Sequence, residues 1–213
     1  PAILAFAACR LALPLFTFAG YVLAESRLSF RLVHLTQVFL GWLPGGLAVV
    51  AFVTCAFFTA FTGASGVTIV AVGALLLPAL VQAGYPEKFS LGLVTTSGSL
   101  GLLLAPSLPL IIYGVIVQQM DLPLPFTIQE LFIAGTLPAL LMIVLLTGYS
   151  IWVTRGAPIV RGSYTRADAL AAVKASRWEI PMPILVLGGI YSGYFAVSEA
   201  AAVTAFYVLL VEV

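Results

Sequence analysis

The chain alternates between long apolar runs and short breaks made of polar residues, glycine and proline. A helix that crosses a bilayer needs about 20 apolar residues, and several of the runs approach that length. The run over residues 28–42 is different, because its leucines share one face with polar residues elsewhere, so we expect it to lie along the membrane interface. The pattern predicts helices over residues 2–24, 28–42, 47–61, 67–81, 89–119, 127–154 and 180–191, and from residue 200 onward.

Two of the breaks fall where a membrane helix is least expected to stop. The first puts Thr62, Gly63, Ala64, Ser65 and Gly66 between two apolar arms, which predicts a helical hairpin over residues 44–83 with its tip at 62–66. The second, at residues 105–109, interrupts a helix predicted over 87–120. Irregular backbone at membrane depth is tolerated only when it is buried in protein or lines a cavity, and paired breaks point to a transporter binding site.

Composition decides the protein class. With 62% hydrophobic residues, 8% charged residues and a mean hydropathy of +1.16, the chain is predicted to be an all-α integral membrane protein with a single membrane domain over residues 1–213. The net charge of +1 gives no basis for a nucleic-acid partner. The cysteines Cys9 and Cys55 lie in apolar runs without metal or redox spacing, so they are interpreted as small buried residues.

The basic residues predict an orientation. Five of them lie in the polar segment 155–177, which the positive-inside rule places in the cytoplasm. Counting helices backwards from this loop puts both ends of the hairpin and the start of the interrupted helix on the same side. Of the nine Lys and Arg residues, only Arg10 is then placed on the opposite side of the membrane. The five residues are Arg155, Arg161, Arg166, Lys174 and Arg177.

The candidate chemistry is binding by oxygen atoms. A hard cation such as Na⁺ prefers oxygen ligands, and a broken helix frees carbonyl groups from their helical partners. An anion is favoured at helix N-termini, where free N–H groups point outward. The same hydroxyls can instead bond the preceding turn or simply pack closely between helices. The hydroxyls near the two breaks belong to Thr62, Ser65, Thr68, Ser97, Ser99 and Ser107.

An ordered set of short motifs resembles the large membrane subunit of the tripartite ATP-independent periplasmic (TRAP) transporters. The resemblance runs through nearly the whole chain, and its specificity comes from the order of the motifs. They are LPLF (13–16), AG (19–20), GWLPGG (41–46), GAS (63–65), GSLG (98–101), APS (105–107), IIYG (111–114), LFIAG (131–135), GYF (193–195) and EAAA (199–202).

This resemblance implies a sodium-coupled secondary transporter that imports an organic acid, such as a dicarboxylate or a sialic-acid-like carboxylate. It also implies a periplasmic binding protein and a small membrane subunit as partners, an elevator mechanism built on inverted repeats, and the inner membrane of a bacterium or archaeon. No cofactor beyond Na⁺ as coupling ion is expected. Because the chain begins without Met and ends in an apolar run, we expect a fragment holding the first repeat and the start of the second.

The expected ion and substrate site combines the two breaks with the end of the helix between them. The family commonly has Ser at position 64 and Pro at position 105, where this chain has alanine, so side-chain contacts there are not expected. Na⁺ is expected through Gly63, Ser65, Ala105 and Ser107. The full set of predicted site residues is Thr62, Gly63, Ser65, Gly98, Ser99, Ala105, Pro106 and Ser107.

Two other functions fit parts of the pattern. The residues Gly63 to Gly66 also match the nucleophile motif of rhomboid-like intramembrane serine proteases, which require a His on a later helix as base. The one histidine, His34, precedes the serine and lies in the interfacial run, which disfavours an enzyme. An elevator transporter of another family, or a channel, would share the hairpin and the broken helix. Glu199 is either a functional intramembrane carboxylate or a cap of the last helix at Ser198.

Overall fold

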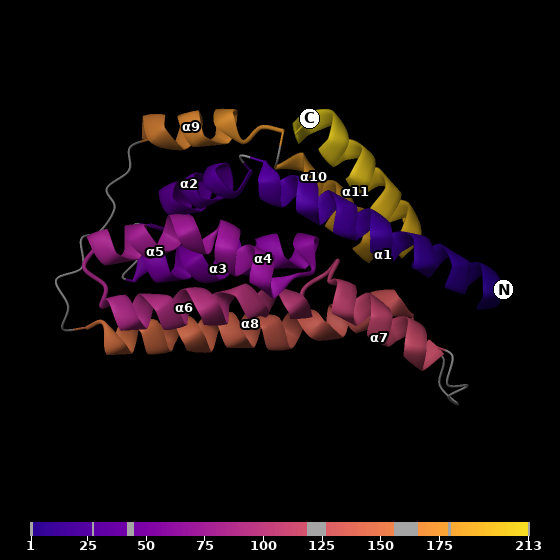
Figure 1. Ribbon diagram of the computed structural model, residues 1–213, viewed down its shortest axis with the longest axis horizontal. Helices are drawn as coiled ribbons and strands as arrows, with labels where there is room; N and C mark the ends of the chain where they lie inside the picture. Colours follow the sequence, from indigo (N-terminus) through magenta and orange to yellow (C-terminus); the bar gives the residue numbers. More distant parts are fainter. Residues whose placement is uncertain are drawn as a thin grey trace.

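A computed structural model describes residues 2–26, 28–41, 45–118, 127–155, 166–178 and 180–212. Within these ranges every regular element is a helix, which confirms the predicted all-α class (Figure 1). The elements are α1 (Ala2–Glu25), α2 (Leu28–Leu40), α3 (Gly46–Thr62), α4 (Ser65–Ala71), α5 (Gly73–Gln82), α6 (Glu87–Leu100), the 3₁₀ turn η1 (Gly101–Leu103), α7 (Leu108–Gln118), α8 (Ile128–Val153), α9 (Arg166–Ala175), α10 (Pro181–Tyr191) and α11 (Val197–Glu212).

The centre of the bundle is α3, which is apolar on all sides and mostly buried. A helix of this kind needs neighbours all round, and α3 packs against α1, α2, α6, η1 and α8. Figure 1 shows α3, α5, α6 and α8 running roughly side by side, with α2 and α9 on the opposite side from α8. A hydroxyl pair fastens α2 to α3, since Thr36 Oγ1 lies 2.7 Å from Thr54 Oγ1.

The hairpin is formed by α3, a two-residue tip, and an arm that bends. Gly63 ends α3 in the left-handed region at φ 65°, a conformation that glycine adopts without strain. Ala64 is extended and leads directly into α4, so the irregular tip is shorter than the predicted 62–66. The arm bends by 49° between α4 and α5. Gly73 stands at this bend and Pro78 follows in α5, and both residue types weaken a helix.

The break in the second half begins earlier than predicted. The prediction placed it at residues 105–109, whereas α6 already ends at Leu100, a 3₁₀ turn follows, and α7 begins at Leu108. Pro109 therefore belongs to the first turn of α7, where a missing N–H costs no helical hydrogen bond. At Gly101, where the 3₁₀ turn begins, the chain presses against α3.

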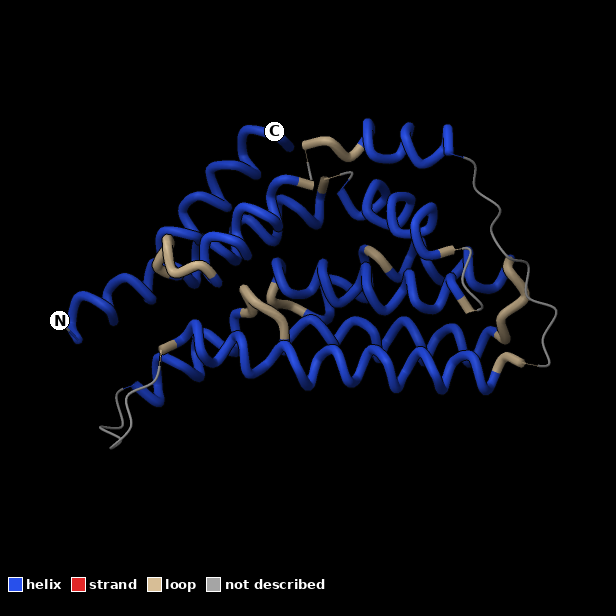
Figure 2. The backbone as a smooth tube through the Cα atoms, turned by 180° about the vertical axis from the view of Figure 1, so that it is seen from behind, coloured by secondary structure: helices blue, strands red, loops and turns tan. Residues whose placement is uncertain are grey.

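The remaining helices form a second group. α1 crosses the bundle obliquely and packs along α11, and α10 lies beside α11 (Figure 2). Glu199 caps the start of α11. Its carboxylate accepts a hydrogen bond from the Ala196 N–H at 2.9 Å, in the turn before the helix. The predicted capping role is thus confirmed, with Ala196 as the capped residue in place of Ser198. α9 lies within the predicted loop 155–177, of which residues 156–165, with Arg161, fall outside the described residues.

α8 is the longest helix among the described residues, and its N-terminus is well defined. A complete capping box starts it: the Glu130 N–H donates to Thr127 Oγ1 at 3.2 Å, and the Thr127 N–H donates to the Glu130 carboxylate at 2.8 Å. Its apolar side chains are largely exposed, with Leu137 at 74%. In the part of the chain that the structure describes, two stretches are long and apolar enough to cross a membrane, Glu87–Val117 and Ile128–Val153, and the bent pair α4–α5 is a third if counted as one span.

The close approach of η1 to α3 gives a first testable prediction. A Cβ at Gly101 would overlap the Ala56 carbonyl oxygen and lie 2.6 Å from Thr59 Cβ, so Gly101→Ala must push η1 away from α3. Overpacking of this kind costs about 1–3 kcal/mol of unfolding free energy. We expect a lower midpoint of thermal unfolding for the full-length protein in detergent.

Gly148→Ala is the matched control, because a Cβ at Gly148 on α8 meets nothing within 4 Å. This change should leave the midpoint unchanged or raise it, as alanine favours helix. Equal stability of the two variants would contradict the close packing of η1 on α3.

Candidate functional site

The hairpin tip and the break between α6 and α7 lie against each other. A Cβ at Gly63 would lie 2.5 Å from Leu108 Cδ1, so the tip touches the first residue of α7. A Cβ at Gly98 would lie 2.5 Å from Ile69 Cγ1 and 3.4 Å from the Ser65 carbonyl oxygen, so the last turn of α6 rests on the start of α4. Two irregular segments that are about 40 residues apart in sequence thus share one region (Figure 1).

Two further helices, α1 and α8, pack against this region at glycine residues. A Cβ at Gly20 of α1 would lie 2.6 Å from Thr62 Cα, and one at Gly135 of α8 would lie 2.6 Å from the Leu103 carbonyl oxygen. Small residues allow helix backbones to approach this closely. The tip is therefore half-buried and residues 105–107 of the break are buried, and burial in protein is the condition for irregular backbone at membrane depth.

A cluster of buried threonine hydroxyls lies behind the tip. The Thr59 hydroxyl is 2.6 Å from Thr68 Oγ1 and 2.8 Å from the Gly98 carbonyl oxygen. Thr62 Oγ1 lies 3.4 Å from Thr68 Oγ1, and Thr68 can also donate to the Ala64 carbonyl at 3.4 Å. A hydroxyl has one proton and two lone pairs, so this cluster, which joins α3, α4 and α6, holds more acceptor positions than protons.

The break carries one strongly placed hydroxyl. Ser107 is fully buried, and its hydroxyl donates to the Leu102 carbonyl at 2.7 Å. Its N–H donates to the Leu104 carbonyl at 3.0 Å, which folds the break back on itself. Because the proton of the hydroxyl is used internally, its lone pairs remain for a further partner. α7 adds backbone donors, since the N–H groups of Leu108 and Leu110 have no partner within that helix.

The eight predicted site residues differ in how they are placed. Gly63, Ser65 and Gly98 lie together at the contact of tip and α6, and Thr62 joins them through Thr68. Ser65 is partly exposed, and Ser99 is the exposed member of the set, on the last turn of α6. The buried members are Thr62, Gly98, Ala105, Pro106 and Ser107.

The sequence analysis did not identify Thr59, and it named Thr68 as a nearby hydroxyl without including it among the predicted site residues. Both are completely buried, and Thr59 bonds across to α6. Thr59 stands one helical turn before Thr62 in an otherwise apolar run, so a hydroxyl stripe on one face of α3 was the available signal. Gly20 and Gly135 gave no such signal, because their partners lie far away in the sequence.

The chain matches known transporters along almost its whole length. Residues 6–213 match the family described as tripartite ATP-independent periplasmic transporter, DctM component. The chain belongs to this family.

Three relatives illustrate the match. An isethionate TRAP transporter permease protein DctMQ of Oleidesulfovibrio alaskensis is 37% identical over 94% of this chain and 31% of its own length. An ectoine TRAP transporter large permease protein TeaC of Halomonas elongata is 35% identical, over 96% of this chain and 47% of its own length. A C4-dicarboxylate TRAP transporter large permease protein DctM of Rhodobacter capsulatus is 33% identical, over 95% and 48%.

This DctM-family chain thus spans about a third to a half of the curated relatives it matches. Family members are transporter permeases and not enzymes, so the protease alternative is set aside. His34, which that alternative would need as a base, is exposed on α2. In this TRAP chain the charge at the tip and break is low: the described acidic side chains are exposed, and among the described residues no three of His, Cys, Asp and Glu gather as a metal site.

The threonine cluster yields a second prediction. Thr68→Val keeps the shape of the side chain but removes its hydroxyl, so Thr59 retains only the Gly98 carbonyl as partner. A buried hydrogen bond contributes about 1 kcal/mol, and we expect a lower unfolding midpoint of the full-length permease in detergent by a corresponding amount. Thr95→Val is the control, since Thr95 is exposed and bonds only the Leu91 carbonyl of its own helix. If both variants unfold at the same midpoint, the cluster does not stabilise the contact of α3, α4 and α6.

Proposed function

We propose that this chain is part of the large permease subunit of a sodium-coupled secondary transporter, which imports an organic acid. The observation that carries the proposal is the contact of the hairpin tip with the break between α6 and α7, around uncharged oxygen atoms. Membership in the DctM component family supports the transport function, and the geometry supports a binding site at this contact.

Sodium coupling is supported by the chemistry of the donors. Carbonyl and hydroxyl oxygens are the ligands that hard cations prefer, and the region offers Ser65, Ser107 and the backbone of Gly63 and Ala105. Ser107 uses its proton on Leu102, which leaves lone pairs for a cation. With no carboxylate among the described residues of this contact, a bound Na⁺ brings a net positive charge that favours an anionic substrate beside it.

The substrate class is proposed to be a carboxylate. The N-terminus of α7 presents the N–H groups of Leu108 and Leu110 next to the tip, and such a helix end favours negative charge. The relatives are named for isethionate, ectoine and C4-dicarboxylates. Because these names differ at similar identity, the family match leaves the compound open, and a dicarboxylate or a sialic-acid-like acid remains within the proposed class.

The remaining parts of the proposal concern the assembly. We place the full-length protein in the inner membrane of a bacterium or archaeon, with a small TRAP membrane subunit and a periplasmic binding protein that delivers the substrate. For the mechanism we propose an elevator movement in which the hairpin and the broken helix travel together. The close packing of Gly98 against Ile69 of α4 and of Gly101 against the backbone of α3 favours this, because segments packed so closely slide poorly past each other.

The decisive experiment measures uptake of radiolabelled organic acids, including C4-dicarboxylates, into proteoliposomes. These contain the full-length permease, its small subunit and its binding protein, with and without an inward sodium gradient. We expect uptake that needs both sodium and the binding protein. Ser65→Ala and Ser107→Ala each remove one proposed oxygen ligand and should raise the sodium concentration for half-maximal uptake about tenfold, as expected for losing a hydrogen-bond-sized interaction to a charge.

Ser90→Ala is the matched control. Ser90 is a buried serine in the first turn of α6, away from the tip and the break, and its hydroxyl donates to the Pro86 carbonyl at 3.1 Å. Ser90→Ala should leave the sodium dependence of uptake unchanged. Uptake that is the same with and without sodium refutes the sodium coupling. Normal sodium dependence in both Ser65→Ala and Ser107→Ala refutes the roles of these two serines and leaves the transport function unaffected.

A further inference from the structure

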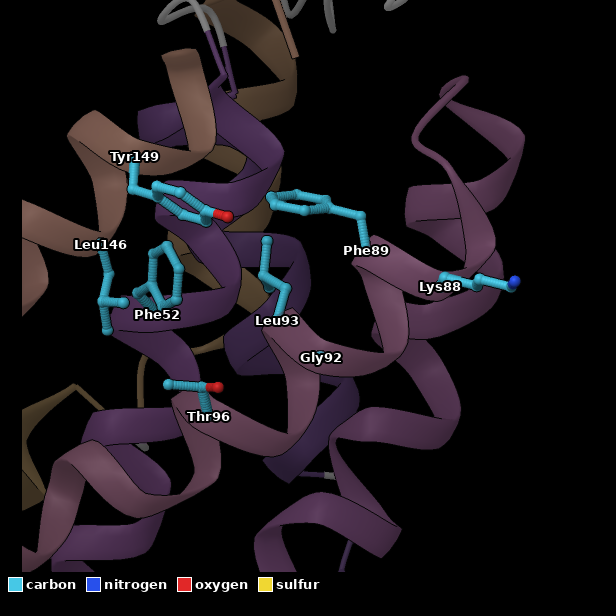
Figure 3. Close-up of a pocket in the computed structure, with 8 residues that line it drawn as sticks. All are labelled: Phe52, Lys88, Phe89, Gly92, Leu93, Thr96, Leu146 and Tyr149. Atoms are coloured by element: carbon cyan, nitrogen blue, oxygen red, sulfur yellow. The ribbon is translucent and has the colours of Figure 1, made fainter. Parts of the chain in front are cut away.

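A hollow lies on the outer side of the bundle, away from the hairpin tip. It is a groove of about 280 Å³ between α6 and α8, with α3 as its floor (Figure 3). Phe52 and Leu93 form the buried bottom, at 3% and 5% exposure. The walls are formed by Phe89, Leu146 and Tyr149. The groove is therefore apolar inside and open on the side where α6 and α8 face outward.

Gly92 creates the hollow. Lys88, Gly92 and Thr96 follow each other at intervals of four residues, so they lie along one face of α6. A Cβ at Gly92 would meet nothing within 4 Å, which shows that no neighbouring side chain fills the space. From Lys88 to Thr96 the helix rises about 12 Å. The groove is thus an elongated slot that follows the helix axis.

One end of the slot carries positive charge and aromatic side chains. Lys88 lies in the first turn of α6, and Figure 3 shows its ammonium group pointing outward, away from the aromatic walls. Arg155 follows the end of α8 and is exposed. The Tyr149 and Trp152 rings lie 6.2 Å apart on α8, and both side chains are exposed. Such aromatic residues sit at the level of lipid headgroups.

The opposite charge near this end is Glu87. Its side chain is exposed and stands at the first position of α6, where a carboxylate interacts favourably with the positive end of the helix dipole. Lys88 and Arg155 are both exposed and can therefore meet an external anion. An apolar slot of this length, with Lys88 in its lining, suits part of one acyl chain of a lipid whose headgroup is anionic.

We propose that this groove binds an anionic phospholipid of the surrounding bilayer. One acyl chain lies in the slot over Phe52 and Leu93, and the phosphate-bearing headgroup lies at Lys88 and Arg155. The exposed apolar surface of α8 next to the groove supports a lipid as occupant, since Leu145, which precedes the lining residue Leu146, is 58% exposed. The transported acid does not suit the slot, because burying a carboxylate against Phe52, Phe89 and Leu146 is costly.

The test uses native mass spectrometry of the full-length permease in detergent, titrated with phosphatidylglycerol or with phosphatidylcholine as the uncharged counterpart. A Cβ at Gly92 meets nothing within 4 Å, so the side chain of Gly92→Leu is expected to occupy part of the slot. Displacing two buried methylene groups already weakens binding about tenfold, so the variant should lose one tightly bound phosphatidylglycerol. Gly148→Leu is the control, since it adds the same side chain to open space on α8 outside the groove. Lys88→Ala should abolish the preference for phosphatidylglycerol over phosphatidylcholine.

The outcomes separate the possible occupants. Loss of one phosphatidylglycerol in Gly92→Leu alone, together with the lost preference in Lys88→Ala, supports the proposal. Equal lipid binding by wild type and Gly92→Leu overturns it. If Gly92→Leu then also unfolds at a lower temperature than Gly148→Leu, the slot is filled by the rest of the permease chain. Equal loss in both glycine variants means unspecific lipid contact and also overturns it. None of these readouts depends on sodium or on transport.

Discussion

The structure depends on one constraint: backbone that leaves the helix at membrane depth must be enclosed by other backbone. The hairpin tip at Gly63 and the break that begins at Gly101 satisfy it jointly, because each covers the other and α1 and α8 close over both. The approaches of Gly20, Gly101 and Gly135 are close backbone contacts, where a side chain would hold the backbones apart. The enclosure leaves carbonyl and hydroxyl groups facing inward, where they bond one another through Thr59, Thr68 and Ser107. A polar centre in an apolar protein is thus a direct result of the two interruptions.

The helices differ in how much of their surface is buried, and their roles differ accordingly. α3 is covered on all sides and carries the hydroxyls that meet α2 and α6, so it acts as the scaffold of the tip. α8 is almost the reverse, as its side chains are apolar but largely exposed. In a soluble protein that exposure would indicate a large unmet interface, whereas in a membrane protein it is the surface offered to lipid or to other transmembrane segments. The apolar slot lies between these two kinds of helix, above Phe52 of α3 and beside Tyr149 of α8.

Sequence reasoning found the elements well where local signals exist. The helix predicted over residues 127–154 matches α8, and the position of the tip followed from small and polar residues between two apolar arms. The family membership was also found, because it depends on the order of motifs. What failed depended on contacts between distant segments. Gly101 at the end of α6 fits closely against Ala56 of α3, and the bond from Thr59 to Gly98 joins residues 39 positions apart. The sequence-predicted ligands of Na⁺ remain a prediction.

The capped, uninterrupted length of α8 has a consequence for the bilayer itself. Its 26 residues extend for about 39 Å, whereas the hydrocarbon core is about 30 Å thick. A helix with this mismatch must tilt, thicken the lipid around it, or extend its ends into the headgroup region. Thr127 and Glu130 at one end and Trp152 at the other are suited to the headgroup region, while the apolar middle is not. The contact of Gly135 with η1 ties this helix to the break, so a change in bilayer thickness would act on the same backbone that encloses the tip.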